Sequence, residues 1–102
     1  LYEDAIAEFT AACDEEADQQ SANFLLAQCH FDLQQMEKAV TQFKTALESA
    51  EDNSDLANHI QYRLGLSFEA LGQPAKAALH FQKISERVDL FPDIALRLQH
   101  LA

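Results

Sequence analysis

The sequence contains few residues that interrupt regular structure: its 102 residues include two glycines, two prolines and no tryptophan. Because glycine and proline mark most turns, this scarcity predicts few turns, and the abundance of Ala, Leu, Gln and Glu indicates an all-α chain. No stretch approaches the roughly 20 apolar residues that a membrane-spanning helix needs. The chain begins with neither a methionine nor the basic start of a signal peptide, so we expect a fragment of a longer protein.

Cysteine is also scarce. Cys13 and Cys29 are too few for a disulfide framework, and both fall within helical patterns. This placement favours buried, reduced thiols, with a disulfide bridge or a reactive site as the alternatives. Reduced thiols in turn predict a cytoplasmic location.

Basic residues are absent from the first third of the chain. Residues 1–37 carry nine acidic residues and no Lys or Arg, whereas residues 38–102 carry eight acidic and seven basic residues. We therefore expect no nucleic-acid partner, because phosphate contacts need clustered Lys and Arg. The acidic third either attracts a basic partner or serves only as a solvated surface.

Residue types that carry catalysis are present without the spacing that catalysis needs. The four histidines have no i, i+4 pairing; they are His30, His59, His80 and His100. The chain has no His-Glu-x-x-His run, Gly-rich phosphate loop or Cys-x-x-Cys pair, and its acidic clusters at 14–18 and 51–55 lack the spacing of a calcium loop. A cysteine with a histidine base is the remaining catalytic alternative. We predict a non-catalytic protein without a metal or cofactor.

The sequence repeats itself. Three segments share an alanine, then a phenylalanine four residues later, then a small or aliphatic residue: YEDAIAEFTAA (2–12), MEKAVTQFKTA (36–46) and PAKAALHFQKI (74–84). A second pair of segments aligns Ala27 with Gly65: FLLAQCHFDLQQ (24–35) and YRLGLSFEALGQ (62–73). The intervals of 34 and 38 residues differ by a polar insertion around 48–55. Such a period predicts an array of helical repeats.

Each repeat consists of two helices with a break of two or three residues between them, which permits only an antiparallel hairpin. Gly72 supplies a left-handed residue that ends one helix, and Pro74 fits the first turn of the next. Gln34 and Gln35 fill that place in the preceding repeat without glycine, so we expect a less sharply defined turn there. Gly65 lies inside a helix, where Gly costs about 1 kcal/mol relative to Ala. We interpret it as a packing residue that lets two helices approach closely.

The pattern predicts six helices, near residues 2–17, 21–33, 36–50, 55–71, 74–88 and 92–101. We interpret the chain as a single domain. Residues 1–18 hold the second helix of a partial repeat, and residues 20–52 and 54–90 are complete repeats. Residues 91–102 are a capping helix or the first helix of a further repeat.

These residues resemble the tetratricopeptide repeat family. Its 34-residue unit has a Leu-Gly pair and an aromatic residue on helix A, then Gly, an aromatic and Ala-x-x-x-Phe-x-x-Ala across helix B. The matching residues here are Leu64, Gly65, Phe68, Gly72, Ala77 and Phe81. His30 stands where an aromatic is expected, and Pro74 replaces the usual aromatic after the turn. The resemblance implies a right-handed α-solenoid of antiparallel helix-turn-helix repeats.

The resemblance also implies a protein-protein interaction scaffold, because helices A of this family line a concave groove that receives a peptide or protein segment. Carried over residue by residue, the groove holds Phe24, Gln28, Phe31, His59, Tyr62, Arg63, Leu66 and Leu96. On the same side lie Ser21, Leu25, Asp32, Glu69, Asp93, Arg97 and His100. Phe24, Leu25 and Leu66 fit the hydrophobic core equally well.

The predicted groove differs from the carboxylate clamp of this family, which grips a peptide's C-terminal carboxylate with Lys, Asn and Arg. Only Arg63 has a suitable charge, so we expect a basic or amphipathic partner segment instead. The alternative function is a structural or oligomerisation segment. Its terminal helices would then pair with a second copy, as a homodimer, or with the rest of a larger protein.

Overall fold

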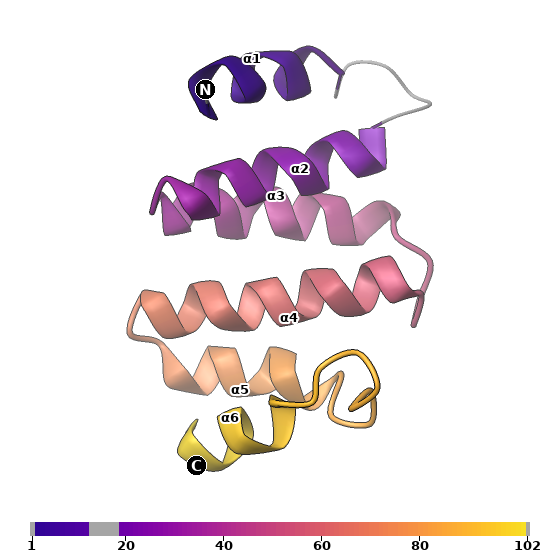
Figure 1. The fold of residues 1–102 in the computed structure, drawn as a ribbon, viewed down its shortest axis with the longest axis vertical. Helices are drawn as coiled ribbons and strands as arrows, with labels where there is room; N and C mark the ends of the chain where they lie inside the picture. The colour runs from indigo at the N-terminus through magenta and orange to yellow at the C-terminus, as the bar shows by residue number, and fades with distance from the viewer. Residues whose placement is uncertain (1, 13–18, 102) are drawn as a thin grey trace. The chain divides into compact units, whose positions relative to one another are not determined.

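The computed structural model describes residues 2–12 and 19–101, and these ranges contain six α-helices and no strand. The helices are α1 (Tyr2–Ala12), α2 (Gln19–Asp32), α3 (Met36–Ser49), α4 (Asp55–Ala70), α5 (Pro74–Gln82) and α6 (Ile94–Leu101) (Figure 1). The all-α prediction is confirmed. The stacking of the repeats into a right-handed solenoid stays a prediction.

The chain divides into two compact units of three helices, residues 1–50 and residues 51–102. In the first unit α2 packs against both α1 and α3, and in the second α5 packs against both α4 and α6. Helices α2 and α3 form an antiparallel hairpin, as do α4 and α5 (Figure 1). Each unit is therefore a helical hairpin with one additional helix.

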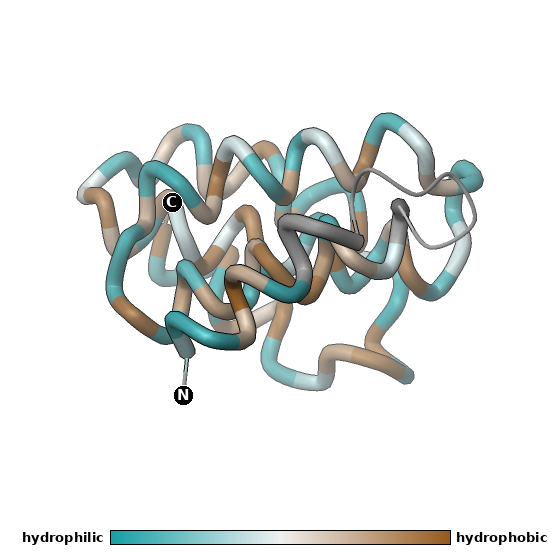
Figure 2. Tube along the Cα trace, turned by 90° about the horizontal axis from the view of Figure 1, so that it is seen from above, coloured by the Kyte–Doolittle hydropathy of each residue, from teal (hydrophilic) through white to brown (hydrophobic). Residues whose placement is uncertain are grey.

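The two hairpins bury the same positions of the repeat. In the first hairpin these are Leu26, Ala27, Ala39, Phe43 and Ala46, and 38 residues later they are Leu64, Gly65, Ala77, Phe81 and Ile84. Hydrophobic and hydrophilic stretches are interleaved along the trace (Figure 2). Helix α3 buries one face through Ala39, Phe43 and Ala46, and α4 does so through Ile60, Leu64 and Phe68. Ala5 on α1 is only partly buried, and the side chains of Phe9 and Ala12 lie outside the described residues.

Gly65 is a packing residue, as predicted. A Cβ added at this position would lie 2.5 and 2.7 Å from Cζ and Cδ1 of Phe81, and closer still to Cε1. Phe81 is fully buried and has little room to move. The ring of Phe81 therefore occupies the space that any other residue at position 65 would need.

The turn at Gln34 is as sharply defined as the turn at Gly72, so the expectation of a looser turn was wrong. Gln34 takes a left-handed backbone with φ of 63°, close to the 72° of Gly72. The N–H of Gln35 donates to the carbonyl of His30 at 2.8 Å, and that of Gln73 donates to the carbonyl of Phe68 at 2.9 Å. Gln34 adopts a conformation that costs an L-residue roughly 1–2 kcal/mol and closes the same turn.

The fifth helix ends at Gln82 and not at residue 88, which corrects the sequence prediction. Beyond it the chain continues in tighter turns, in which the N–H groups of Ile84 and Arg87 donate to carbonyls three residues earlier. These turns bring Arg87 to the carboxylate of Asp55, 3.0 Å away, and bury Phe91 to 4% exposure. Tertiary contacts thus outweigh the local helical pattern of residues 83–88.

The remaining predicted bounds agree with the structure to within two residues wherever it describes the chain. Helix α6 begins at Ile94 and not at residue 92, because Pro92 and Asp93 lie in a turn. The expected helix at 2–17 is confirmed as far as Ala12, and residues 13–17 lie outside the described residues.

Replacing Gly65 by Ala should destabilise the protein by about 1–3 kcal/mol, because the added methyl overlaps the Phe81 ring. Helix propensity alone would stabilise the variant by about 1 kcal/mol, so the sign of the change distinguishes the two effects. Urea unfolding followed by circular dichroism measures it. A Gly65→Ala protein as stable as the parent would contradict the close approach.

The matched pair Gln34→Gly and Gly72→Ala tests the left-handed turns. Gln34→Gly should stabilise the fold by about 0.5 kcal/mol, since it removes backbone strain at the cost of some unfolded-state entropy. Gly72→Ala should destabilise it by about 1 kcal/mol, although no atom lies within 4 Å of the added Cβ. Changes of equal sign in the same unfolding assay would argue against this account.

Candidate functional site

Helix α2 has a buried face and a partly exposed face. Ala22, Leu26 and Ala27 are at most 4% exposed. Phe24, Gln28 and Phe31 follow one another at i, i+4 and i+7, so they share a face, and all three are partly exposed. Leu25 beside them is 39% exposed, and Ser21 and Asp32 are exposed. The three residues that the sequence assigned to a groove on this helix therefore lie together.

Helix α4 repeats this arrangement. His59, Tyr62, Arg63 and Leu66 lie at i, i+3, i+4 and i+7, with His59 exposed and the others partly exposed. The opposite face is buried through Ile60, Leu64 and Phe68. The predicted groove residues of α4 therefore also share one face.

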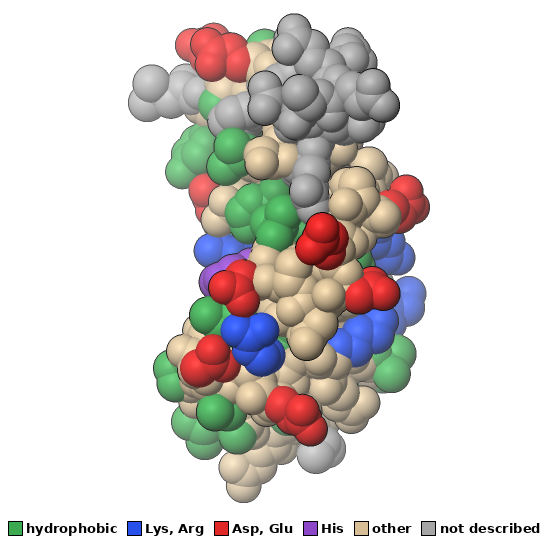
Figure 3. Space-filling view, turned by 90° about the vertical axis from the view of Figure 1, so that its right-hand side faces the viewer, with side chains coloured by type: hydrophobic (Ala, Val, Ile, Leu, Met, Phe, Trp, Pro, Cys, Tyr) green, Lys and Arg blue, Asp and Glu red, His purple; other side chains and the backbone are tan. Residues whose placement is uncertain are grey.

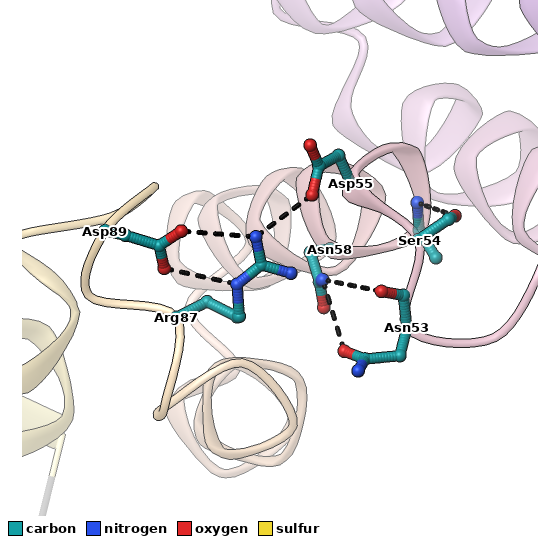
Figure 4. Close-up of polar contacts among 7 residues, drawn as sticks. Asn53, Ser54, Asp55, Asn58, Arg87 and Asp89 are labelled. Atoms are coloured by element: carbon teal, nitrogen blue, oxygen red, sulfur yellow. Dashed lines mark hydrogen bonds and ion pairs between the residues drawn. The ribbon is translucent and has the colours of Figure 1, made fainter.

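The start of α4 is fixed by side-chain caps. The Oγ of Ser54 accepts a hydrogen bond from the N–H of Ala57 at 3.1 Å, which satisfies a backbone donor of the first turn. The amide of buried Asn58 donates to the backbone and side-chain oxygens of Asn53, both at 3.4 Å (Figure 4). Asn53 has a φ of 58°, a left-handed conformation that Asn tolerates better than most residues.

The aromatic ring of Tyr62 is engaged within its own unit. Phe91 stacks on it with centroids 4.5 Å apart and planes 10° apart, and Phe81 packs tilted at 5.8 Å. The Arg97 guanidinium lies 5.7 Å from the centre of the Tyr62 ring. The rings of His59 and Phe91 pack nearly perpendicular to each other, with centroids 5.0 Å apart. Tyr62 thereby joins α4 to the segment 83–93 and to α6.

The Tyr62 hydroxyl is engaged as well. It donates a hydrogen bond to Oδ2 of Asp93 at 2.7 Å, and Nε of Arg97 donates to the same oxygen at 2.6 Å. The hydrogen bond from Tyr62, and then the one from Arg97, lowers the pKa of Asp93 below its ordinary value. Burial, with the hydrogen bond to Asp93, raises the pKa of Tyr62. Arg97 also pairs with Glu69 at 3.3 Å.

Sequence reasoning missed Phe91 and the segment that carries it. The hydrophobic pair Leu90-Phe91 directly before Pro92 is the signal that could have marked this segment as an anchor. Asp93 and Arg97, which the sequence placed on the groove side, pair with each other. Leu96 is 60% exposed on α6, where His100 is exposed too.

The charged side chains of the second unit are extensively paired. Arg87 binds Asp55 at 3.0 Å and Asp89 at 3.2 Å, which fastens the segment 83–93 to the start of α4 (Figure 4). In the lower part of the face that Figure 3 shows, basic side chains lie close to acidic ones, in keeping with the ion pairs of Arg87 and Arg97.

Cys29 is a buried, free thiol, as expected. Burial raises its pKa, and the negative charge of Asp32 adds to this effect. A raised pKa leaves less of the reactive thiolate at neutral pH. Cys13 lies outside the described residues, so the expectation for it stays a prediction.

Chemistry-bearing side chains do not converge in the described parts of the chain. No group of three or more His, Cys, Asp or Glu residues there could hold a metal ion. A surface hollow beside the α2–α3 turn is lined by His30, Glu37, Lys38, Thr41 and Gln42. Of the helices in residues 2–12 and 19–101, none is long and apolar enough to span a membrane.

Repeated antiparallel hairpins with the same buried positions define a helical-repeat protein. A family model described as tetratricopeptide repeat matches residues 1–65, and a second model of the same description matches residues 60–88. The chain belongs to the tetratricopeptide repeat family. Neither a curated protein nor a solved structure matches it. Repeats of this family generally mediate protein–protein interactions and are typically non-catalytic.

Tyr62→Phe should destabilise the protein by about 1–2 kcal/mol at neutral pH, because it removes a hydrogen bond to an ionised carboxylate. The folded state lowers the pKa of Asp93, so this stability is present above the unfolded-state pKa and is lost as pH falls through the folded-state pKa. Urea unfolding between pH 7 and pH 2 measures the difference.

An Asp52→Asn variant is the control, since this exposed carboxyl should alter stability by less than about 0.5 kcal/mol. If Tyr62→Phe destabilised the protein as much at pH 2 as at pH 7, the hydroxyl would act through a group other than Asp93.

Proposed function

We propose that the chain is a non-catalytic protein-interaction module that binds a peptide or protein segment along the helix faces described above. The binding residues are Phe24, Gln28 and Phe31 on α2, His59, Tyr62, Arg63 and Leu66 on α4, and Leu96 on α6. The observation that carries the proposal is the face of α2. It leaves two aromatic rings partly exposed beside an exposed leucine, and aromatic residues are enriched in interface cores.

The composition of these faces favours an apolar anchor over a charged one. Arg63 is the one cation among the eight proposed residues, and an exposed ion pair contributes only about 0–1 kcal/mol. A peptide held by its C-terminal carboxylate would therefore gain little here. An amphipathic helix or an extended apolar segment would bury more surface, and basic flanks would suit the acidic first third of the chain.

The alternative function is assembly through the terminal helices. Tyr2 on α1 is 44% exposed and Leu96 on α6 is 60% exposed, so each of these helices presents a large hydrophobic side chain. Light scattering over a range of concentrations tests this alternative directly. A molar mass that rises with concentration supports it.

The proposed binding function is tested by selecting a segment from a displayed library of protein fragments with the whole chain, then titrating it calorimetrically. Phe31→Ala should weaken binding by about tenfold or more, because a buried aromatic anchor commonly supplies 2 kcal/mol or more. Arg63→Ala should have a smaller effect. Leu79→Ala is the matched control, since Leu79 is 61% exposed but lies on α5.

Tyr62→Ala is a poor probe of binding, because Tyr62 also anchors Phe91 and Asp93. If Phe31→Ala, Gln28→Ala and Arg63→Ala all bound like the parent, the ligand would lie elsewhere. Assembly through α1 and α6 would then be the better account.

A further inference from the structure

The two hairpins contain the same aromatic pair. Phe24 and Phe43 have ring centroids 5.9 Å apart and planes at 58°, and Tyr62 and Phe81, 38 residues later, have 5.8 Å and 57°. In each pair the first ring is partly exposed on the first helix and the second is fully buried on the second helix. Phe24 and Tyr62 therefore occupy equivalent positions, and what packs on Tyr62 indicates what could pack on Phe24.

The pairs differ in what lies on the first ring. Phe91 stacks on Tyr62 at 4.5 Å with nearly parallel planes and is itself 4% exposed. Among the described residues, Phe43 is the one ring that packs on Phe24. The residue 38 positions before Phe91 in the sequence is Asn53, so the repeat has an aromatic residue at this position only in its second copy.

We propose that the face of α2 around Phe24 binds an aromatic side chain of a partner protein segment, stacked on Phe24 as Phe91 is stacked on Tyr62. The proposal rests on the proposed function and specifies the anchor of its ligand. Leu25, exposed beside Phe24, offers an aliphatic contact to the residue next to that anchor. The segment Leu90-Phe91-Pro92, which fills the place on α4, is the template for the ligand.

The charges around Tyr62 on α4 differ from those around Phe24 on α2. This difference determines which charged residues the ligand should carry beside its aromatic anchor. On α4 the aromatic anchor is followed two residues later by Asp93, which Tyr62 and Arg97 hold through hydrogen bonds. Phe24 has no hydroxyl, and Leu25 stands in place of Arg63. Neither Phe24 nor Leu25 could therefore donate a hydrogen bond to an acidic residue of the ligand, as Tyr62 does to Asp93.

The first unit instead favours basic flanks. Asp32 ends α2, and Glu3 and Asp4 lie on α1, which packs against α2. Residues 1–37 contain no Lys or Arg to offset these acids. The ligand is therefore an aromatic residue between aliphatic neighbours, flanked by Lys or Arg and not by Asp or Glu.

Three capped hexapeptides test the proposal by calorimetry and by amide chemical shifts of the whole chain. DLFPDI copies residues 89–94 of this chain, KLFPKI replaces its two acids by lysine, and KLAPKI also removes the aromatic ring. KLFPKI should bind with a Kd below about 1 mM and shift the amides of α2. The other two peptides should bind at least about tenfold more weakly.

Phe24→Leu is the decisive variant, because it keeps an apolar side chain against Phe43 and removes only the ring. It should weaken KLFPKI binding at least about tenfold, whereas the control Leu79→Ala, at an exposed position of α5 outside the proposed binding residues, should leave it unchanged. Equal binding of KLFPKI and KLAPKI, an unaffected Phe24→Leu variant, shifts confined to α4, or no binding of KLFPKI would each overturn the proposal. If a library-selected segment still bound through Phe31, the proposed function would survive that result.

Discussion

Helices α4 and α5 can approach each other as they do only because residue 65 has no Cβ. The ring of Phe81 fills that space, and the partly exposed ring of Tyr62 packs on it. Tyr62 in turn carries Phe91 on its ring and Asp93 on its hydroxyl, and Asp93 holds Arg97 of α6. The position of the last helix thus depends, through a series of side-chain contacts, on the missing methyl group of one glycine.

The features that the sequence predicts well are those that local spacing determines. A period of 38 residues and short breaks are enough to place the hairpins, and the helical period is enough to place Phe24, Gln28 and Phe31 on one face. What local spacing does not determine is the path of residues 83–93. That path is set by contacts of Arg87 with Asp55 and of Phe91 with Tyr62, about thirty residues away in the sequence.

The structure differs from the sequence prediction at Gln34 and Tyr62 as well, and there too tertiary contacts outweigh the local pattern. Gln34 takes a left-handed backbone that propensity disfavours, because the packing of the hairpin requires the turn that Gly72 also makes. Tyr62 appears on a groove face by its spacing, yet its hydroxyl and ring bind residues of its own unit. Periodicity shows on which face of a helix a side chain lies. It does not show whether that side chain already contacts other residues of its own unit, as Tyr62 on α4 does.

The early end of α5 leaves the two helices of the second hairpin very different in length. At 1.5 Å per residue α4 is about 24 Å long and α5 about 13 Å, so the first turns of α4 extend beyond the end of its antiparallel partner. Residues 83–93, held by Arg87 at Asp55 and by Phe91 at His59, cover that length instead. Non-helical backbone opens more readily than a packed helix. We therefore expect amide hydrogen exchange in the first turns of α4 to follow the opening of residues 83–93, about thirty residues later in the sequence.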